Sequence, residues 1–289
     1  MDRLPLYFIE EVVSYLSDVD ARSCSALTSY WGSRAATHSR LVRIRLSFVI
    51  PEGPYAGDSV YCSLNYRPFD FSAFEGKFTV YEVVATKTES IRSIGRNYAI
   101  LDAEGIQKLA KILERSVRAT SVVFDGRVPD SPQLQRILFS VASVNSITCL
   151  TGASAPVALI ERSIAKGTLE ILKLNNVATG NVDLLKALTQ LSALIRLKEV
   201  CLNVARNHEE NPMVFLKAVM NGWMENPLQE GRLRIYHSRG LDTKDALEKL
   251  GLKKENDKIE YEGRLLHVKE IVSRKFYFMV KLDMGNAKP

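Results

Sequence analysis

The stretch LEILKLNN at residues 169–176 sets Leu169, Leu172 and Leu174 in an apolar-x-x-apolar-x-apolar frame and ends in two asparagines. The second half of the frame alternates apolar and polar side chains, which is typical of a strand with one buried face. The last apolar positions of this and three similar frames, 124, 149, 174 and 202, stand 25, 25 and 28 residues apart. This regular spacing indicates an internal repeat. The other frames are Ala119, Val122 and Phe124; Val144, Ile147 and Cys149; and Leu197, Val200 and Leu202.

Stretches with helical spacing separate these predicted strands, and a degenerate fifth strand holds Leu233 and Ile235. A strand–turn–helix unit this short cannot bury its own apolar faces, so stacked units with a parallel sheet are the economical arrangement. A doubly wound sheet with helices on both faces is the alternative, and both belong to the α/β class. The helical apolar positions are Leu134, Ile137, Leu138 and Val141; Leu159, Ile160 and Ile164; Leu184, Leu185, Leu188 and Leu191; and Phe215, Leu216, Val219 and Trp223.

The repeating unit resembles the leucine-rich repeat, whose strand ends in an asparagine as residues 169–176 do. The other copies lack the asparagine, so the resemblance implies a short, divergent solenoid with a parallel sheet. We assign residues 78–289 to this domain, beginning with a strand at 78–85 and a helix at 103–116. Alternating side chains within 259–282 indicate a half-exposed strand that caps the open end of the stack.

The first part of the chain has helical spacing instead of strand frames. Phe8, Ile9, Val12, Val13 and Leu16 fall on one side of a helix entered through Pro5, and Ala21, Cys24 and Leu27 predict a second helix. Arg34, His38, Arg40, Arg43 and Arg45 then decorate a third short helix that runs into a strand at 46–50. A unit of this size lies near the lower limit for independent folding, so we expect it to bury its apolar face against something else.

The spacing Leu4-Pro5, Val12, Leu16, Asp20, Cys24, Leu27 and Trp31 resembles the F-box, in which Leu-Pro opens a helix and a Trp closes the module. The match runs without a gap from Leu4 to Trp31. Arg22 departs from the family's more usual aliphatic residue, and Thr28-Ser29-Tyr30 from a more basic stretch, which bears on adaptor affinity more than on the fold. We therefore assign residues 1–46 to an F-box-like module and 47–77 to an irregular connector, in which turn-forming residues such as Pro51, Gly53 and Asn65 outnumber helix signals.

The F-box resemblance implies a substrate-recognition subunit of a cullin-type ubiquitin ligase. Its N-terminal module binds the ligase adaptor and, through it, a cullin, and the repeat domain binds a target protein. The residues expected at the adaptor contact, or in the small core behind it, are Leu4, Pro5, Phe8, Ile9, Val12, Leu16, Leu27 and Trp31.

Strand alternation defines the side of the repeat domain that would hold the target. Side chains adjacent to the buried frame positions point to the opposite face. On that basis the expected target-binding residues are Asp125, Lys173, Asn175, Asn203, Arg234 and Tyr236. Such a mixture of polar, charged and aromatic groups suits protein recognition, although it is equally typical of a solvated sheet face.

The rest of the sequence favours a non-catalytic protein without a cofactor or metal. No nucleophile motif or phosphate loop occurs, and His38, His208, His237 and His267 lack neighbours at metal-ligand spacing. The net charge of +6 comes from 39 basic and 33 acidic residues that are interspersed, so nucleic acid is not the expected partner. The alternative function is a repeat scaffold or nucleic-acid-associated protein whose N-terminal helices only cap the stack.

The four cysteines and the hydropathy pattern bear on the compartment. Cys24, Cys62, Cys149 and Cys201 form no close pair, and we expect free thiols, with Cys24, Cys149 and Cys201 at apolar positions. The strand register places Cys201 on the outer face, which conflicts with burial unless another element covers it. No stretch approaches the roughly 18 apolar residues of a membrane span, so we expect a soluble protein of the cytoplasm or nucleus.

Overall fold

The computed structural model of the protein describes most of the chain between residues 5 and 283. The described residues are 5, 8–9, 12–13, 16, 18–39, 41–51, 59–76, 78–88, 94–116, 118–126, 131–150, 155–178, 180–191, 194, 197–204, 211, 213–225, 232–236, 248–249, 251, 253–255, 258–261, 264–274 and 277–283.

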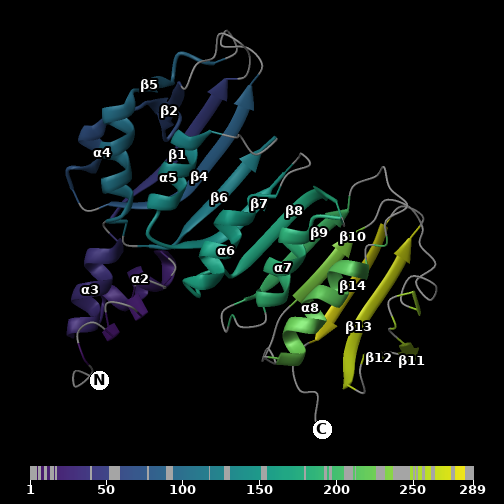
Figure 1. The fold of residues 1–289 in the computed structure, drawn as a ribbon. Helices are drawn as coiled ribbons and strands as arrows, with labels where there is room; N and C mark the ends of the chain where they lie inside the picture. Colours follow the sequence, from purple (N-terminus) through teal and green to yellow (C-terminus); the bar gives the residue numbers. More distant parts are fainter. Residues whose placement is uncertain are drawn as a thin grey trace.

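A curved, mostly parallel sheet runs through the molecule (Figure 1). From one side to the other its strands follow the order β10-β9-β8-β7-β6-β4-β1-β2-β3, so β4 and β6 to β10 lie side by side in chain order. The parallel strands are β1 (Val42–Pro51), β4 (Phe78–Thr88), β6 (Thr120–Asp125), β7 (Val144–Cys149), β8 (Ile171–Val177), β9 (Glu199–Val204) and β10 (Arg232–Tyr236).

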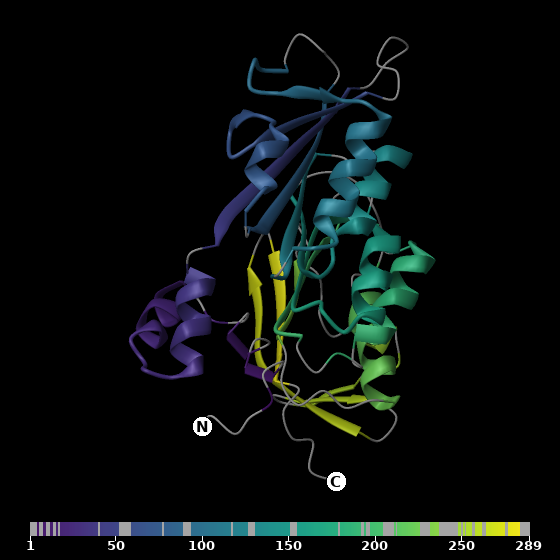
Figure 2. The same ribbon diagram turned by 90° about the vertical axis from the view of Figure 1, so that its left-hand side faces the viewer.

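Five helices connect these strands and lie on one face of the sheet (Figure 2). A doubly wound sheet would place helices on both faces and reverse the strand order, so that alternative does not describe this arrangement. The fold is α/β with a mixed, mostly parallel sheet. The helices are α4 (Ala103–Leu113), α5 (Pro132–Ser140), α6 (Val157–Ala165), α7 (Val182–Gln190) and α8 (Met213–Glu225).

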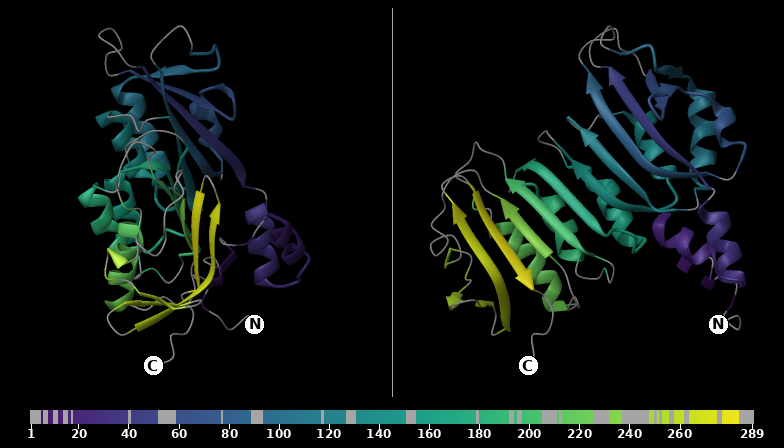
Figure 3. Two further views of the ribbon diagram at one scale, coloured as in Figure 1. Left: turned by 90° about the vertical axis from the view of Figure 1, so that its right-hand side faces the viewer. Right: turned by 180° about the vertical axis from the view of Figure 1, so that it is seen from behind.

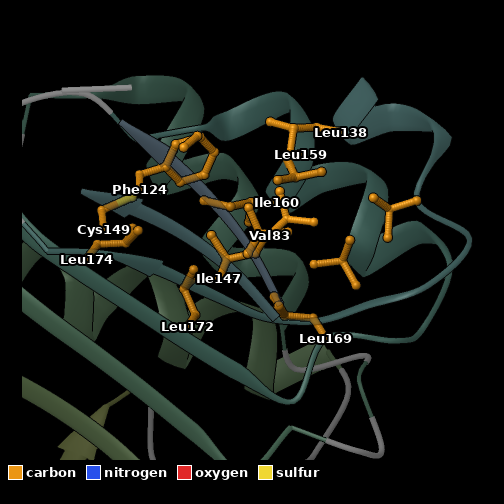
Figure 4. Close-up of a cluster of buried hydrophobic side chains, with 14 of the residues drawn as sticks. Val83, Phe124, Leu138, Ile147, Cys149, Leu159, Ile160, Leu169, Leu172 and Leu174 are labelled. Atoms are coloured by element: carbon orange, nitrogen blue, oxygen red, sulfur yellow. The ribbon is translucent and has the colours of Figure 1, made fainter. Parts of the chain in front are cut away.

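The repeated frames form the centre of the core between the sheet and its helices (Figure 4). Val122, Ile147, Leu172 and Val200 are paired from strand to strand and are at most 2% exposed. The second row, Phe124, Cys149, Leu174 and Leu202, is equally buried. The prediction that these side chains face inward is therefore confirmed.

Three side-chain hydrogen bonds join the repeat of α6 and β8 to the preceding repeat at the interval found in the sequence. Lys166 Nζ donates to the carbonyl of Ala142 at 2.9 Å, and Thr168 Oγ1 donates to the carbonyl of Val144 at 2.8 Å. Asn175 Nδ2 reaches the carbonyl of Leu150 at 2.7 Å. The acceptors are backbone carbonyls just after α5 and at or next to the two ends of β7. Residues that are 24 or 25 positions apart in the chain are therefore hydrogen-bonded neighbours in adjacent repeats.

The region expected as a connector belongs largely to the sheet, which corrects the assignment of residues 47–77. β1 starts at Val42 and continues to Pro51, so the sheet also extends into the assigned 1–46 module. The antiparallel strands β2 (Val60–Leu64), β3 (Arg67–Pro68) and β5 (Ala99–Leu101) and the 3-10 helix η1 (Phe71–Phe74) complete this edge. The turn-forming residues misled the prediction because one of them, Asn65, forms a tight hairpin between strands.

The N-terminal helices form a small unit with its own apolar cluster. Phe8, Ile9, Val12 and Val13 are helical, and α2 (Asp18–Ser25) and α3 (Tyr30–Ser39) follow. Figures 2 and 3 show this unit near the beginning of β1, on the side of the sheet away from α4–α8. Its buried residues, Ile9, Val13 and Ala35, are separate from the main core, and Leu16, Cys24, Tyr30 and Trp31 pack against them.

At the other end of the sheet, four antiparallel strands follow β10. They are β11 (Lys253–Glu255), β12 (Lys258–Tyr261), β13 (Arg264–Arg274) and β14 (Tyr277–Asp283). β14 lies beside β10 (Figure 1), at the position expected for an element that follows the last repeat. The alternation at residues 276–282 corresponds to β14, and the earlier part of the 259–282 stretch holds two further strands, β12 and β13.

Candidate functional site

The residues expected to contact an adaptor divide into a buried and an exposed group. Ile9 is only 1% exposed and belongs to the cluster of the N-terminal unit, so it is a core residue and not a surface contact. Phe8 and Leu27 are 42% and 54% exposed. Pro5 is also exposed, Val12, Leu16 and Trp31 are half-buried, and Leu4 lies outside the described residues.

Backbone geometry fixes the position of Leu27 relative to α3. The carbonyl oxygen of Leu27 lies 1.8 Å from the place where a Cβ on Gly32 would be, so only glycine fits there without a shift of backbone. The Gly32 amide donates to Ser29 Oγ at 3.4 Å, at the beginning of the helix. This close approach holds the turn at residues 26–29 against α3 and leaves the Leu27 side chain at the surface.

Of the expected target-binding residues, Asp125, Lys173, Asn175 and Asn203 lie on the face of the sheet opposite α4–α8. Thr148, Lys173, Cys201 and Arg234 form one continuous row across β7 to β10, and Tyr236 is paired with Asn203 in the next row. Asp125 is exposed, and Lys173, Asn175 and Asn203 are half-buried. The side chains of Arg234 and Tyr236 lie outside the described part of the structure.

Two of these residues make contacts within the domain. Lys173 Nζ lies 3.0 Å from Glu199 Oε2 on the neighbouring strand. The Asn175 amide donates to the backbone of Leu150, as described above. Both side chains therefore link neighbouring repeats, and these contacts hold them in place on the surface that a partner would contact.

A second group on the same face was not anticipated from the sequence. Arg43 and Arg45 on β1 lie over the rings of Tyr81 and Tyr66, with 4.8 Å and 4.6 Å between guanidinium carbon and ring centroid. Arg45 also forms an ion pair with Glu82. We call Arg43, Arg45, Tyr66, Tyr81 and Glu82 the arginine–tyrosine patch. Arg43 and Arg45 were noted only as part of a basic string, and nothing in the spacing of the two tyrosines linked them to it.

The buried thiols of the core, Cys62 and Cys149, are expected to be unreactive. Burial raises the pKa of Cys149 to about 12 and raises the pKa of Cys62 well above its usual value. Both remain protonated near neutral pH and pack as small apolar groups. The prediction of burial is right for Cys149, whereas Cys24 and Cys201 are half-buried.

Across the described residues, no three His, Cys, Asp or Glu side chains come together as metal ligands would. In that same part of the chain, no helix combines the length and apolarity needed to cross a bilayer.

Comparison of the chain with protein families, with characterised proteins and with solved structures finds no match. The function must therefore be argued from the surfaces described above.

Proposed function

We propose that this protein is a substrate-recognition subunit of a cullin-type ubiquitin ligase. The N-terminal unit is an F-box-like module that docks on the ligase adaptor. The parallel-sheet domain is a short, divergent solenoid of the leucine-rich-repeat kind that holds a target protein.

The observation that carries the proposal is the exposure of Phe8 and Leu27 on a helical unit with its own core. Large apolar side chains at the surface of a small helical module are typical of a docking surface. Among its described residues, Ile9, Val13 and Ala35 form the buried cluster of this unit, and docking would add the burial of Phe8 and Leu27, which would stabilise it. These features agree with the F-box pattern of residues 4–31.

The sheet domain supports the second half of the proposal. Strands in chain order with helices on one face are characteristic of solenoids, and the uncovered sheet face of such proteins is a frequent binding surface. The row Thr148, Lys173 and Cys201 and the neighbouring Asp125 and Asn203 provide polar and charged groups on fixed strands. A target held there would lie on the side of the sheet that also carries the N-terminal unit (Figure 3).

The mechanism requires no chemistry from this chain. Simultaneous binding of adaptor and target raises the local concentration of a target lysine near the ubiquitin carrier, and this proximity accelerates transfer. The affinity of each contact and the geometry between them set the rate.

Co-precipitation of the full chain with adaptor and cullin tests the proposal. Phe8→Ser combined with Leu27→Ser should reduce adaptor recovery at least tenfold, because central apolar anchors dominate such interfaces. Val182→Ser is the matched control, since Val182 is 73% exposed on α7 and far from the N-terminal unit in the chain. Equal adaptor recovery with the wild type and the double variant would refute the proposed docking surface.

A repeat scaffold or nucleic-acid-associated protein remains the second candidate. Its supporting feature is the basic string that follows Trp31, in which Arg34 lies over the ring of Tyr30. If the wild-type chain binds no adaptor but binds oligonucleotides in a salt-dependent manner, this candidate replaces the first.

A further inference from the structure

We infer that the arginine–tyrosine patch binds an extended acidic segment of a partner protein, with carboxylates at alternate positions. This surface is separate from the one proposed for the adaptor. The inference therefore does not rest on the ligase function.

The two arginines are presented in a regular way. Arg43 and Arg45 stand two residues apart on β1, so their side chains leave the same face of the sheet. An extended peptide repeats its own side-chain positions at the same interval of about 6.5 to 7 Å for every two residues. Acidic residues at alternate positions of such a segment would match the two guanidinium groups one to one.

Irregular backbone places an aromatic ring beside each arginine. The pairing of β1 with β4 shifts between Ile44 and Arg45, which leaves Tyr81 as an extra residue in β4. Such a bulge re-aims side chains. Here Tyr81 lies under Arg43 while the following Glu82 reaches Arg45.

The hairpin between β2 and β3 supplies the second ring at a conformational cost. Asn65 and Tyr66 both have positive φ, at 50° and 64°, as a two-residue hairpin of this type requires. Glycine is the usual residue at the second position, and tyrosine is strained there. Tyr66 is 67% exposed, so burial of its ring contributes little in return. Its visible contact is with the Arg45 guanidinium.

Side-chain hydrogen bonds tie this hairpin to the strand that carries the arginines. Asn65 Oδ1 accepts from the amide of Arg45 at 2.8 Å, and Asn65 Nδ2 donates to the carbonyl of Arg43 at 3.2 Å. The hairpin, β1 and β4 therefore hold both arginine–tyrosine pairs in one fixed array. Preorganised side chains lose less entropy when a ligand binds.

Guanidinium chemistry selects the ligand. A guanidinium stacked on a ring keeps donors at its edge, and their planar arrangement matches a carboxylate. The ion pair between Arg45 and Glu82 shows that a carboxylate already fits at this edge. Because Glu82 lowers the net positive charge of the patch, a continuous polyphosphate chain is disfavoured more than a peptide, whose carboxylates are fewer and can be spaced by neutral residues. The patch thus favours an acidic protein segment over a nucleic acid.

Fluorescence anisotropy with the full chain and a labelled peptide of Glu-Ser repeats tests this inference at low ionic strength. The wild type should bind this peptide more tightly than a Lys-Ser peptide and more tightly than one with Glu-Glu-Ser-Ser spacing. Arg43→Gln and Arg45→Gln should each weaken binding about tenfold, as loss of a charge-assisted bidentate contact does. Arg67→Gln is the matched control, because Arg67 is exposed on β3 and outside the patch.

Tyr66→Gly separates binding from folding. Glycine relieves the strain at the second hairpin position, so the variant should melt at or above the wild-type temperature and yet bind the Glu-Ser peptide several-fold more weakly. Binding unaffected by Arg43→Gln, Arg45→Gln and Tyr66→Gly would overturn the inference. So would the absence of measurable binding by the wild type, or tighter binding of a single-stranded oligothymidylate than of the peptide.

Discussion

The N-terminal helices and the parallel sheet bury apolar surface on very different scales. The sheet domain has one continuous core that extends from Ile44 on β1 to Val219 on α8, and hydrogen bonds between repeats reinforce it. Among its described residues, the N-terminal unit has a small, separate cluster around Ile9, Val13 and Ala35 and leaves Phe8 and Leu27 at the surface. Because stability follows buried area, the sheet domain should dominate folding, while the small unit is the better candidate for a docking element.

The largest expected effect comes from the centre of the sheet domain. Leu172→Ala removes a fully buried side chain between two repeats and should lower the free energy of unfolding by about 2 to 5 kcal/mol. Urea denaturation followed by circular dichroism measures it. A loss below about 1 kcal/mol would show that the core rearranges to fill the space left by Leu172. It would also contradict the view that the sheet domain is much more tightly packed than the N-terminal unit.

A substitution in the N-terminal unit should have a smaller and more local effect. Gly32→Ala forces a Cβ against the carbonyl of Leu27 and should destabilise this unit by about 1 to 3 kcal/mol while the sheet domain keeps its melting temperature. Limited proteolysis followed by mass spectrometry locates the change. Gly76→Ala, where a Cβ meets nothing within 4 Å, is the control. A uniform loss of stability across the chain would contradict the independence of the two regions.

The pH dependence of stability reports on the core of the sheet. The pKa of Cys149 is about 12 in the folded protein, whereas an exposed thiol has a pKa of about 8.5. Between these values the unfolded chain has lost the proton that the folded chain keeps, so stability falls as pH rises, and it is fully present below about pH 8. One proton corresponds to about 1.4 kcal/mol per pH unit.

Cys149→Ala should remove that contribution. Its unfolding free energy, measured in urea from pH 8 to about pH 10.5, should fall less steeply than that of the wild type by up to this amount. Identical slopes would indicate that the Cys149 thiol is accessible to hydroxide in the folded state.

The smallest effect is expected on the uncovered face of the sheet. Lys173 lies between the buried Leu172 and Leu174 in sequence, but its side chain is 43% exposed and paired with Glu199. Lys173→Ala should therefore cost less than about 1 kcal/mol. Melting curves of Lys173→Ala and Leu172→Ala, recorded together, check the register. An equal loss of melting temperature from both substitutions would contradict the assignment of Leu172 to the buried face of β8 and Lys173 to the uncovered face.

Much of the sheet domain could be predicted because burial imposes a repeating pattern on the sequence. The frame of Leu169, Leu172 and Leu174 has equivalent apolar residues in the neighbouring strands. Equivalent positions in the sequence repeat are the positions that pair in the sheet. The predicted strand at 46–50 lies within β1, but β2 and β3 escaped prediction because turn residues outweighed short strand signals. The hairpin at Asn65 and Tyr66 is the clearest example, since tyrosine gives no sequence signal for positive φ.

The candidate sites were less accessible to sequence reasoning. Phe8 and Ile9 are adjacent apolar residues within a wide helical stripe, and helical spacing alone does not decide which of them is buried. The arginine–tyrosine patch joins residues from β1, β4 and the hairpin, and the bulge at Tyr81 shifts the alternation that would have placed it. The pairing between strands determines which side chains lie together on such a surface. This pairing joins residues far apart in the sequence, so local sequence patterns do not predict it.

Hydrogen exchange of the full chain, measured with and without the purified ligase adaptor, tests whether the N-terminal unit is the docking module. We expect saturating adaptor to slow amide exchange in α2 and α3 and to leave β6 to β9 unchanged, because docking stabilises the N-terminal unit alone. Unchanged exchange in α2 and α3, or protection confined to the strands, would contradict the assignment of this unit as the docking module.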